Sequence, residues 1–421
     1  MKKHFLLSLL LQLTLAFTAQ AQDMTRARQT ITDLTDPTMH GRGYVQEGDK
    51  RAAAYLRQRF RDLGLQALSP DYYQLFSLPV NRFPGNLSLQ VDRKKLIPGR
   101  DFIAHASSGA GSLTGKVLLL DTLVFSQPAA GEKFFREKMH RKVLVLPGKF
   151  YSQLGRLPAT WRRRMESVKG MVLLMPGKLT ASVATEQAPW PVLEVRQSSW
   201  PVQARSVSLA VDAVLEQYPT QNVLAYIPGS IRPDSFLVVS AHYDHLGRQG
   251  RDLLFPGAND NASGTAMLLE LAAWYAQPAN QPRYSIAFMA FGAEEAGLVG
   301  SEYYTRHPVF PLSSIRFLLN LDLLGAGEEG LMVVNGRILE KEFRLLTHLN
   351  EQHPYFPQIK SRGKAANSDH HYFTEKGVPS FFFYTHGGPK AYHDPEDVAA
   401  TLPLSRFREL FLLITAFLPA L

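Results

Sequence analysis

Four strongly apolar segments alternate with helical patterns in the second half of this chain. They are SFLVVSAHYD (235–244), YSIAFMAFG (284–292), IRFLLNLDLLG (315–325) and VPSFFFYT (378–385). Nearly continuous apolar character is typical of strands that are covered on both faces. Between the first two, NASGTAMLLELAAWYAQP predicts a helix with one apolar face, which Ser263 caps and Pro278 ends. From about residue 222 the sequence therefore predicts an α/β fold, with a mainly parallel central sheet and helices on both faces.

The region before this alternation has a different pattern. Short β-type runs such as KVLLLD, KVLVLPGK and MVLLMPGK are separated there by Pro, Gly and polar stretches. This pattern predicts a small β-rich insert. We expect a signal peptide over residues 1–21, the helical N-terminal part of the main domain over 22–75, the insert over 76–211, and the rest of the main domain over 212–421.

The first residues have the pattern of a signal peptide. Lys2 and Lys3 precede an apolar run over residues 5–17, and Ala19-Gln20-Ala21 offers a cleavage site, so the mature chain is expected to begin near Gln22. A single membrane anchor is the alternative, but the run is short for a span. We therefore expect export to the periplasm or the medium, with no stable membrane association.

Composition limits the chemistry that the chain can perform. The sequence contains no cysteine, so any bound metal must be held by nitrogen and oxygen ligands. The net charge of the chain is +9. The clusters of basic residues lie in separate segments, and no repeated pattern of aromatic and basic residues connects them. They predict a solvated surface rather than a nucleic-acid interface. No feature specifies an oligomeric state.

Side chains that can bind a cation follow each of the four apolar segments. Because ligands bind at the carboxyl ends of strands in an open α/β sheet, these groups are expected to gather at one edge. Asp322 lies inside an apolar run, where a carboxylate needs a partner or a metal. The groups are His242 and Asp244, Glu294 and Glu295, Asp322, His393, and Asp260 in the loop before the helix.

These residue types suit a pair of divalent cations. Three carboxylates and two imidazoles can hold two ions about 3.5–4 Å apart, with one carboxylate bridging them. Zinc is favoured, although cobalt or manganese could occupy the site. Asp244 lies two residues after His242, so it could accept the second imidazole N–H and orient the ring. Of the neighbouring Glu294 and Glu295, one could bind metal while the other takes a proton from water.

The segments AHYDHLG, PGANDNASG, FGAEEAGLVGS, NLDLLG, SDHHYF and YHDPEDV resemble the zinc peptidases of family M28, in the family's order. The resemblance implies two zinc ions per chain and assigns a role to each ligand. His242 and Asp322 would hold one ion, Glu295 and His393 the other, and Asp260 would bridge them. Glu294 would be the general base. Tyr392 resembles a tyrosine that stabilises the oxyanion in some members; a buried structural tyrosine is the alternative.

Three other features near these motifs have open interpretations. Asp369, His370 and His371 in SDHHYF could form a third metal site, but a structural, substrate-lining segment is preferred by resemblance. His245 and His386 are near the site in sequence, and no role is assigned to them. The insert resembles a degenerate protease-associated domain.

The expected function is that of an aminopeptidase acting on peptides. Glutaminyl cyclase, a relative with the same ligand order but typically one zinc, is one alternative, which the complete ligand set disfavours. A carboxypeptidase would need a basic group for the terminal carboxylate, for which Arg248, Arg251 and Arg362 are candidates. A non-catalytic binding protein of this fold would lack a ligand or the base. The related M20 peptidases share a similar ligand order, but PGANDNASG favours M28.

Overall fold

The computed structural model describes residues 22–421. The predicted signal peptide, residues 1–21, lies outside the described residues. Within the described part, helices that are both long and apolar enough to cross a bilayer are absent.

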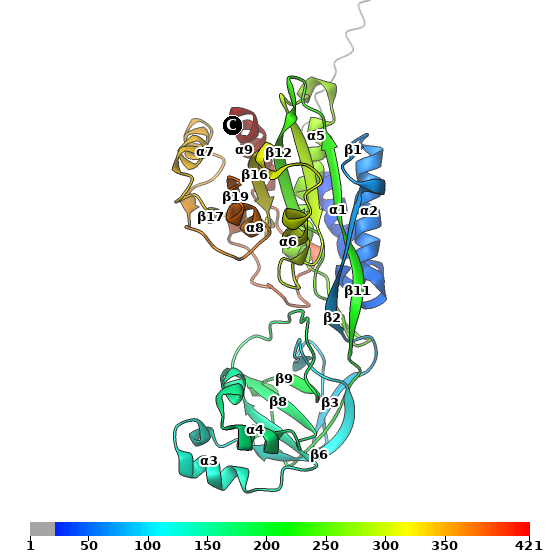
Figure 1. Cartoon of the computed structure of the whole chain (residues 1–421), viewed down its shortest axis with the longest axis vertical. Helices are drawn as coiled ribbons and strands as arrows, with labels where there is room; N and C mark the ends of the chain where they lie inside the picture. The colour runs from blue at the N-terminus through cyan, green and yellow to red at the C-terminus, as the bar shows by residue number, and fades with distance from the viewer. Residues whose placement is uncertain (1–21) are drawn as a thin grey trace, which may run out of the picture.

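The molecule consists of two bodies joined by a long pair of strands (Figure 1). Strands β2 (Tyr73–Arg82) and β11 (Val214–Ile227) pair antiparallel and run from the main body toward the insert. Main-sheet pairing therefore continues to Arg82, past the start at residue 76 expected for the insert. The strands of the insert's own sheet begin at Leu87.

The sheet of the main body is mixed, with its parallel strands at the centre. Its order is β1-β11-β15-β12-β16-β19-β17-β18, with β2 paired to β11. The four central strands β15, β12, β16 and β19 are parallel, whereas β11 and β17 flank them antiparallel. The bounds are β1 Gln66–Ala67, β12 Arg232–His242, β15 Tyr284–Phe291, β16 Ile315–Leu321, β17 Gly330–Val334, β18 Ile359–Ser361 and β19 Ser380–His386.

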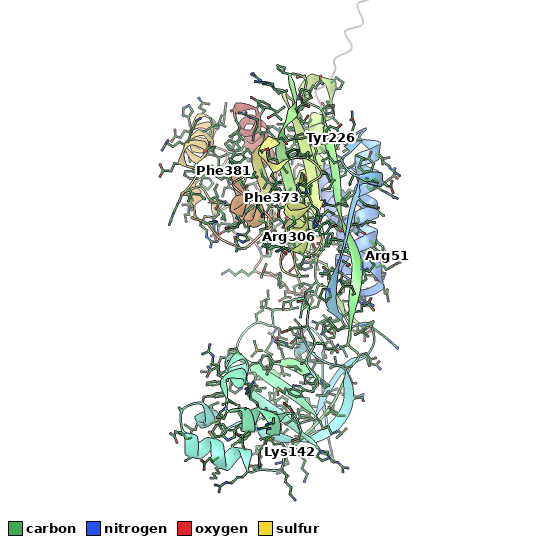
Figure 2. All side chains as sticks on the ribbon, viewed as in Figure 1. Arg51, Lys142, Tyr226, Arg306, Phe373 and Phe381 are labelled. Carbon is green, nitrogen blue, oxygen red and sulfur yellow. The ribbon has the colours of Figure 1, made fainter. Side chains whose placement is uncertain are left out.

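Alternate residues of the central strands enter two different apolar clusters, one on each face of the sheet. In β12, Leu237 and Val239 pack in the cluster that contains Phe381, whereas Val238 packs in the cluster that contains Phe373. Both phenylalanines are labelled in Figure 2. Because both faces are covered, apolar side chains occur at most positions of these strands, on both faces, which explains their nearly continuous apolar character. The first cluster is covered by α1 (Met24–Thr35), α2 (Gly48–Asp62), α5 (Gly264–Tyr275), α7 (Glu340–Gln352) and α9 (Phe407–Ala420), the second by α6 (Val299–Arg306) and α8 (His370–Glu375).

The insert contains an eight-stranded sheet in the order β4-β3-β10-β6-β7-β8-β9-β5. KVLVLPGK and MVLLMPGK form its neighbouring parallel strands β7 and β8. Two short helices connect strands here, so the insert is less purely β than its sequence suggests. The bounds are β3 Leu87–Val91, β4 Lys94–Leu96, β5 Phe102–Ala104, β6 Gly111–Leu119, α3 Pro128–Phe135, β7 Lys142–Pro147, α4 Ala159–Met165, β8 Gly170–Met175, β9 Val192–Arg196 and β10 Ser206–Val211.

An irregular part of the insert contacts the main body. Residues 178–184, here named the return segment, follow β8 and contain no helix or strand. Within this segment Leu179 and Ala181 pack against Leu253 and Phe255 of the main body. The return segment therefore links the insert to the edge of the main sheet where the strands end.

Candidate metal centre

The five predicted ligands lie together at the carboxyl edge of the central strands. His242 is the last residue of β12, and Asp322 directly follows β16. Glu295 lies in the turn after β15, and Asp260 in the turn before α5. His393 comes from the loop after β19. The topology therefore brings together the side chains that the strand pattern predicted would meet.

Their separations divide the five groups into two sets that share Asp260. The Nε2 atom of His242 lies 3.4 Å from Asp260 Oδ1 and 3.4 Å from Asp322 Oδ1. The Nε2 atom of His393 lies 3.2 Å from Asp260 Oδ2 and 3.0 Å from Glu295 Oε2. Ligands at 2.0–2.1 Å from one tetrahedral ion are separated by about 3.3 Å, so each set has the spacing of a zinc ligand sphere. The residues present thus fit a pair of ions.

Electrostatics gives a second reason to expect cations. Burial opposes the charged form of both histidines, yet the surrounding carboxylates raise the pKa of His242 well above its usual range and that of His393 to about 11. Burial, together with Glu295, Asp369 and Asp322, raises the pKa of Glu294 well above that of a free glutamate, although His242 acts against it. Buried carboxylates at this density need positive charge to remain ionised.

The structure corrects the role predicted for Asp244. The Nδ1 atom of His242 is 3.2 Å from the backbone oxygen of Asp244 but 3.8 Å from its nearer carboxylate oxygen, which is too far for a hydrogen bond. The carboxylate instead accepts the backbone N–H groups of Glu294, at 3.1 Å, and Glu295, at 3.3 Å. The reason is that β12 ends at His242, so the strand alternation used for the prediction no longer applies.

The backbone is unusual beside three site residues. Ala293, Leu323 and His393 have positive φ angles of 60°, 56° and 54°. Residues with side chains rarely adopt this conformation, and when they do they cluster at functional sites. Ala293 immediately precedes Glu294, and Leu323 immediately follows Asp322. The sharp turns therefore lie where the chain leaves the strands to present these carboxylates.

Two residues that received no site role in the sequence analysis support the ligands. His245 Nδ1 lies 2.7 Å from Glu295 Oε1, and both side chains are buried. Arg42 is fully buried and donates to the backbone oxygens of Gly257 and Asp260, among others. His245 could have been suspected from its place in AHYDHLG, but no local pattern connects Arg42 to a loop more than 200 residues away.

The SDHHYF segment contributes through Ser368 rather than as a third cluster. The Ser368 hydroxyl donates to Asp322 Oδ2 at 3.1 Å. Burial lowers the pKa of His370 to about 3 and so keeps it neutral. Within residues 22–421, the groups spaced to hold an ion include none of residues 369–371. The segment therefore contacts Asp322, a predicted ligand of the first set.

A cavity of about 190 Å³ opens over the two sets and is lined partly by apolar and aromatic side chains. Tyr392 is one of them; it is 53% exposed and stacks on His393 at 3.8 Å, so it is not a buried structural residue. None of Arg248, Arg251 and Arg362 lines this cavity, although Arg362 donates to the hydroxyl of the lining residue Tyr384 at 3.0 Å. The lining residues are His242, Asp260, Glu294, Asp322, Leu323, Asn367, Phe382, Tyr384, Tyr392 and His393.

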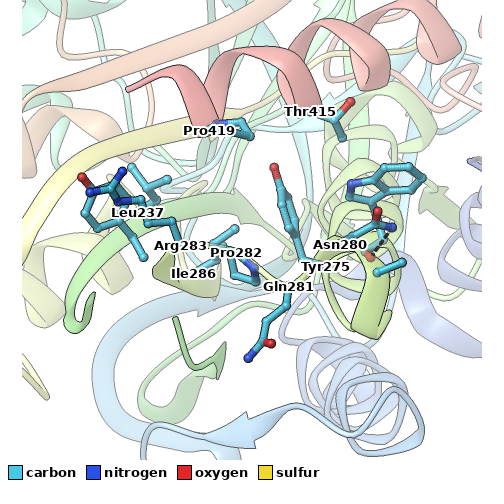
Figure 3. A pocket seen from close by; sticks show the side chains of 12 residues that line it. Leu237, Tyr275, Asn280, Gln281, Pro282, Arg283, Ile286, Thr415 and Pro419 are labelled. Atoms are coloured by element: carbon cyan, nitrogen blue, oxygen red, sulfur yellow. Dashed lines mark hydrogen bonds between the residues drawn. The ribbon is translucent and has the colours of Figure 1, made fainter. Parts of the chain in front are cut away.

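A second cavity, of about 290 Å³, lies at the opposite end of the same strands. Figure 3 shows Tyr275 of α5 in this cavity, below Thr415 and Pro419 of α9. Its walls include Tyr284, the first residue of β15, and exclude all of the predicted ligands. The predicted metal-binding side chains therefore lie at the first cavity and not at the second.

Comparison with known proteins agrees with this geometry. Residues 222–418 match the family model for peptidase family M28. Aminopeptidase YwaD of Bacillus subtilis is 25% identical over 412 residues, covering 93% of this chain and 83% of that protein. The zinc aminopeptidase BSAP of Bacillus subtilis is similar in structure, with a TM-score of 0.67 and 22% identity over 93% of each chain. An aminopeptidase from Aneurinibacillus sp. strain AM-1 gives a TM-score of 0.65 at 17% identity, over 95% of this chain and 94% of that one. Both structural matches span the insert as well as the main body.

Proposed function

Since the chain is a member of peptidase family M28, a family of peptide hydrolases, we propose that it is an aminopeptidase that uses two zinc ions. The observation that carries this proposal is the sharing of Asp260. One carboxylate oxygen faces His242 and the other faces His393, at 3.4 and 3.2 Å. A carboxylate so placed suits a bridge between two ions.

The proposed ligands follow the two sets. His242 and Asp322 would hold one ion, Glu295 and His393 the other, and Asp260 would bridge them. Each set supplies nitrogen and oxygen donors, the combination that zinc accepts in catalytic sites. His245, hydrogen-bonded to Glu295, would fix the orientation of that carboxylate.

Zinc, when bound, supplies Lewis-acid polarisation of the scissile carbonyl and lowers the pKa of water at the site. The proposed role of Glu294 is proton transfer: it takes a proton from the attacking water and delivers it to the leaving amine. Its side chain lines the cavity beside the proposed metal ligands. Asp244 holds the backbone from which Glu294 projects. Tyr392, half-exposed in the same cavity, is proposed to donate to the oxyanion.

The size and walls of the cavity favour exopeptidase action on peptides. A volume of about 190 Å³ accommodates little more than one residue, and Leu323, Phe382 and Tyr384 give it apolar walls. We therefore expect a preference for peptides whose N-terminal residue is apolar.

The test is hydrolysis of a panel of aminoacyl chromogenic amides by the protein from Gln22 onward, with a chelator and zinc add-back, beside Glu294→Gln. Chelation should abolish cleavage and zinc should restore it. Loss of the base should lower kcat at least about 100-fold while zinc remains bound.

Three results would contradict the proposal in different ways. Zinc binding without amide cleavage, accompanied by cyclisation of N-terminal glutamine, would indicate a glutaminyl cyclase. Release of C-terminal residues would indicate a carboxypeptidase, with Arg362 as the candidate group for the carboxylate. Zinc binding without any turnover would favour a binding protein.

A further inference from the structure

The loop that carries His393 is held by the insert, not by the main body alone. Lys178, in the return segment, extends its ammonium group into the loop. Its Nζ atom donates to the backbone oxygens of Lys390, at 3.0 Å, and Tyr392, at 2.7 Å. It also lies 3.2 Å from Asp394 Oδ2. An ammonium group has three N–H donors, so every donor has an acceptor on this one loop.

The backbone of Ala181 makes a second connection, directly to the imidazole. The Nδ1 atom of His393 lies 2.8 Å from the oxygen of Ala181, and the Ala181 N–H donates to the oxygen of His393 at 3.3 Å. Because a carbonyl oxygen only accepts, Nδ1 must carry the proton. The lone pair of the neutral ring is then on Nε2, the atom that faces Asp260 and Glu295.

The loop needs such support. His393 itself has a positive φ of 54°, a conformation that persists only where the surroundings impose it. The preceding loop contains Gly387 and Gly388, both also at positive φ. Ala181 is buried in a cluster with Leu253 and Phe255 and so provides a fixed point against which the loop can be held.

From these contacts we infer that the insert is part of the metal centre: Lys178 is a positioning residue that, with the Ala181 carbonyl, presents His393 to the ion of the second set. The inference rests on the proposed function for the identity of that ion. It gives the insert a role besides any contact with substrate. Displacement of the return segment would loosen one ligand of one ion and leave the His242 set intact.

The matched variants are Lys178→Met, which removes the donors and keeps the length, and Lys178→Arg, which keeps the charge and some donors. Lys95→Met is the control, because Lys95 is an exposed lysine of the same insert. The first measurement is zinc content per chain across a series of buffered free-zinc concentrations. In Lys178→Met, the affinity for one ion should fall about 10- to 100-fold while the other ion is unaffected. The zinc affinity of Lys178→Arg should lie between that of Lys178→Met and that of the control.

The second measurement is amide hydrogen exchange of the metal-free protein in peptides that cover residues 178–184 and 388–396. Faster exchange in Lys178→Met than in Lys95→Met is expected, because the Ala181 N–H bond to His393 should open more often. Identical zinc curves and identical exchange rates would overturn the inference. Neither measurement depends on turnover. If the protein cleaves no aminoacyl amide, the proposed function fails, but zinc content and hydrogen exchange still test the role of Lys178.

Discussion

The carboxylate of Asp244 accepts the backbone N–H of Glu294 at 3.1 Å. The same carboxylate receives the N–H of Glu295, so one side chain at the end of β12 holds the turn that follows β15. These two strands are parallel neighbours. The contact therefore fixes the proposed base relative to His242, which lies two residues before Asp244.

We predict that Asp244→Asn lowers kcat about 10- to 100-fold, the range typical of residues that orient a metal site. An asparagine side chain has a single acceptor oxygen, so it cannot accept both N–H groups in the same geometry. Steady-state kinetics on the best aminoacyl amide tests this, with zinc content measured in parallel. Asp252→Asn, at an exposed carboxylate, is the control. An unchanged kcat would show that the turn holds Glu294 without Asp244.

Metal removal should destabilise the protein, because ligands that bind only the folded state add to its stability. At a free-zinc concentration about 1,000 times Kd, each ion contributes about 4 kcal/mol, which for a chain of this length corresponds to a rise of roughly 5 °C in Tm, or about 10 °C for both ions. Calorimetry with chelator and zinc add-back measures the shift. In Glu294→Gln the rise should persist, whereas in Asp260→Asn it should largely disappear for both ions. Loss of the rise in Glu294→Gln would assign that residue to the ligands.

Arg42→Lys should lower the free energy of unfolding by about 2–6 kcal/mol. The guanidinium makes five hydrogen bonds to backbone oxygens, of which Tyr243, Pro256 and Gly257 are examples. Lysine has three donors, so at least two buried oxygens would lose their partner, at about 1–3 kcal/mol each. Urea unfolding measures the change. Arg51→Lys on the exposed side of α2, labelled in Figure 2, should change stability by less than about 0.5 kcal/mol.

The insert should lose stability as the pH rises through neutrality. Burial raises the pKa of Glu194 in β9 from 4.5 to about 7. The folded state thus binds this proton more tightly than the unfolded state does. The stabilising effect is complete below about pH 4.5, falls as the pH rises, and is lost above about pH 7.

Glu194→Gln removes this dependence, because glutamine stays neutral. The variant should be more stable than the parent at pH 8, by at most about 3 kcal/mol, and the difference should vanish near pH 4.5. Unfolding scans between pH 4.5 and 8 test it. The exposed Glu166→Gln in the same insert is the control. The Nε2 atom of His105 lies 4.0 Å from Glu194 Oε1. A pH-independent difference would mean that folding does not change the pKa of Glu194.

The sequence by itself was sufficient to predict the central strands and that the candidate ligands gather at their ends. SFLVVSAHYD and IRFLLNLDLLG are apolar at nearly every position because β12 and β16 are covered on both faces. Parallel strands align their carboxyl ends, so His242 and Asp322 had to approach one another once the strands were identified. The side chains at the carboxyl ends of the strands can therefore be predicted from the apolar pattern of each strand alone.

Contacts between distant segments were decided only by the tertiary structure. Asp244 turns to Glu294 rather than to His242 because the chain leaves the strand between them, and no periodicity describes such a turn. Arg42 reaches Asp260, and Lys178 reaches the His393 loop, across more than 200 residues of sequence. No regular sequence spacing relates the residues of such a pair. Hydrogen bonds between irregular segments depend on how the folded chain packs these segments against one another. The candidate ligands could therefore be identified from the sequence, whereas the groups that contact and orient them could be identified only from the tertiary structure.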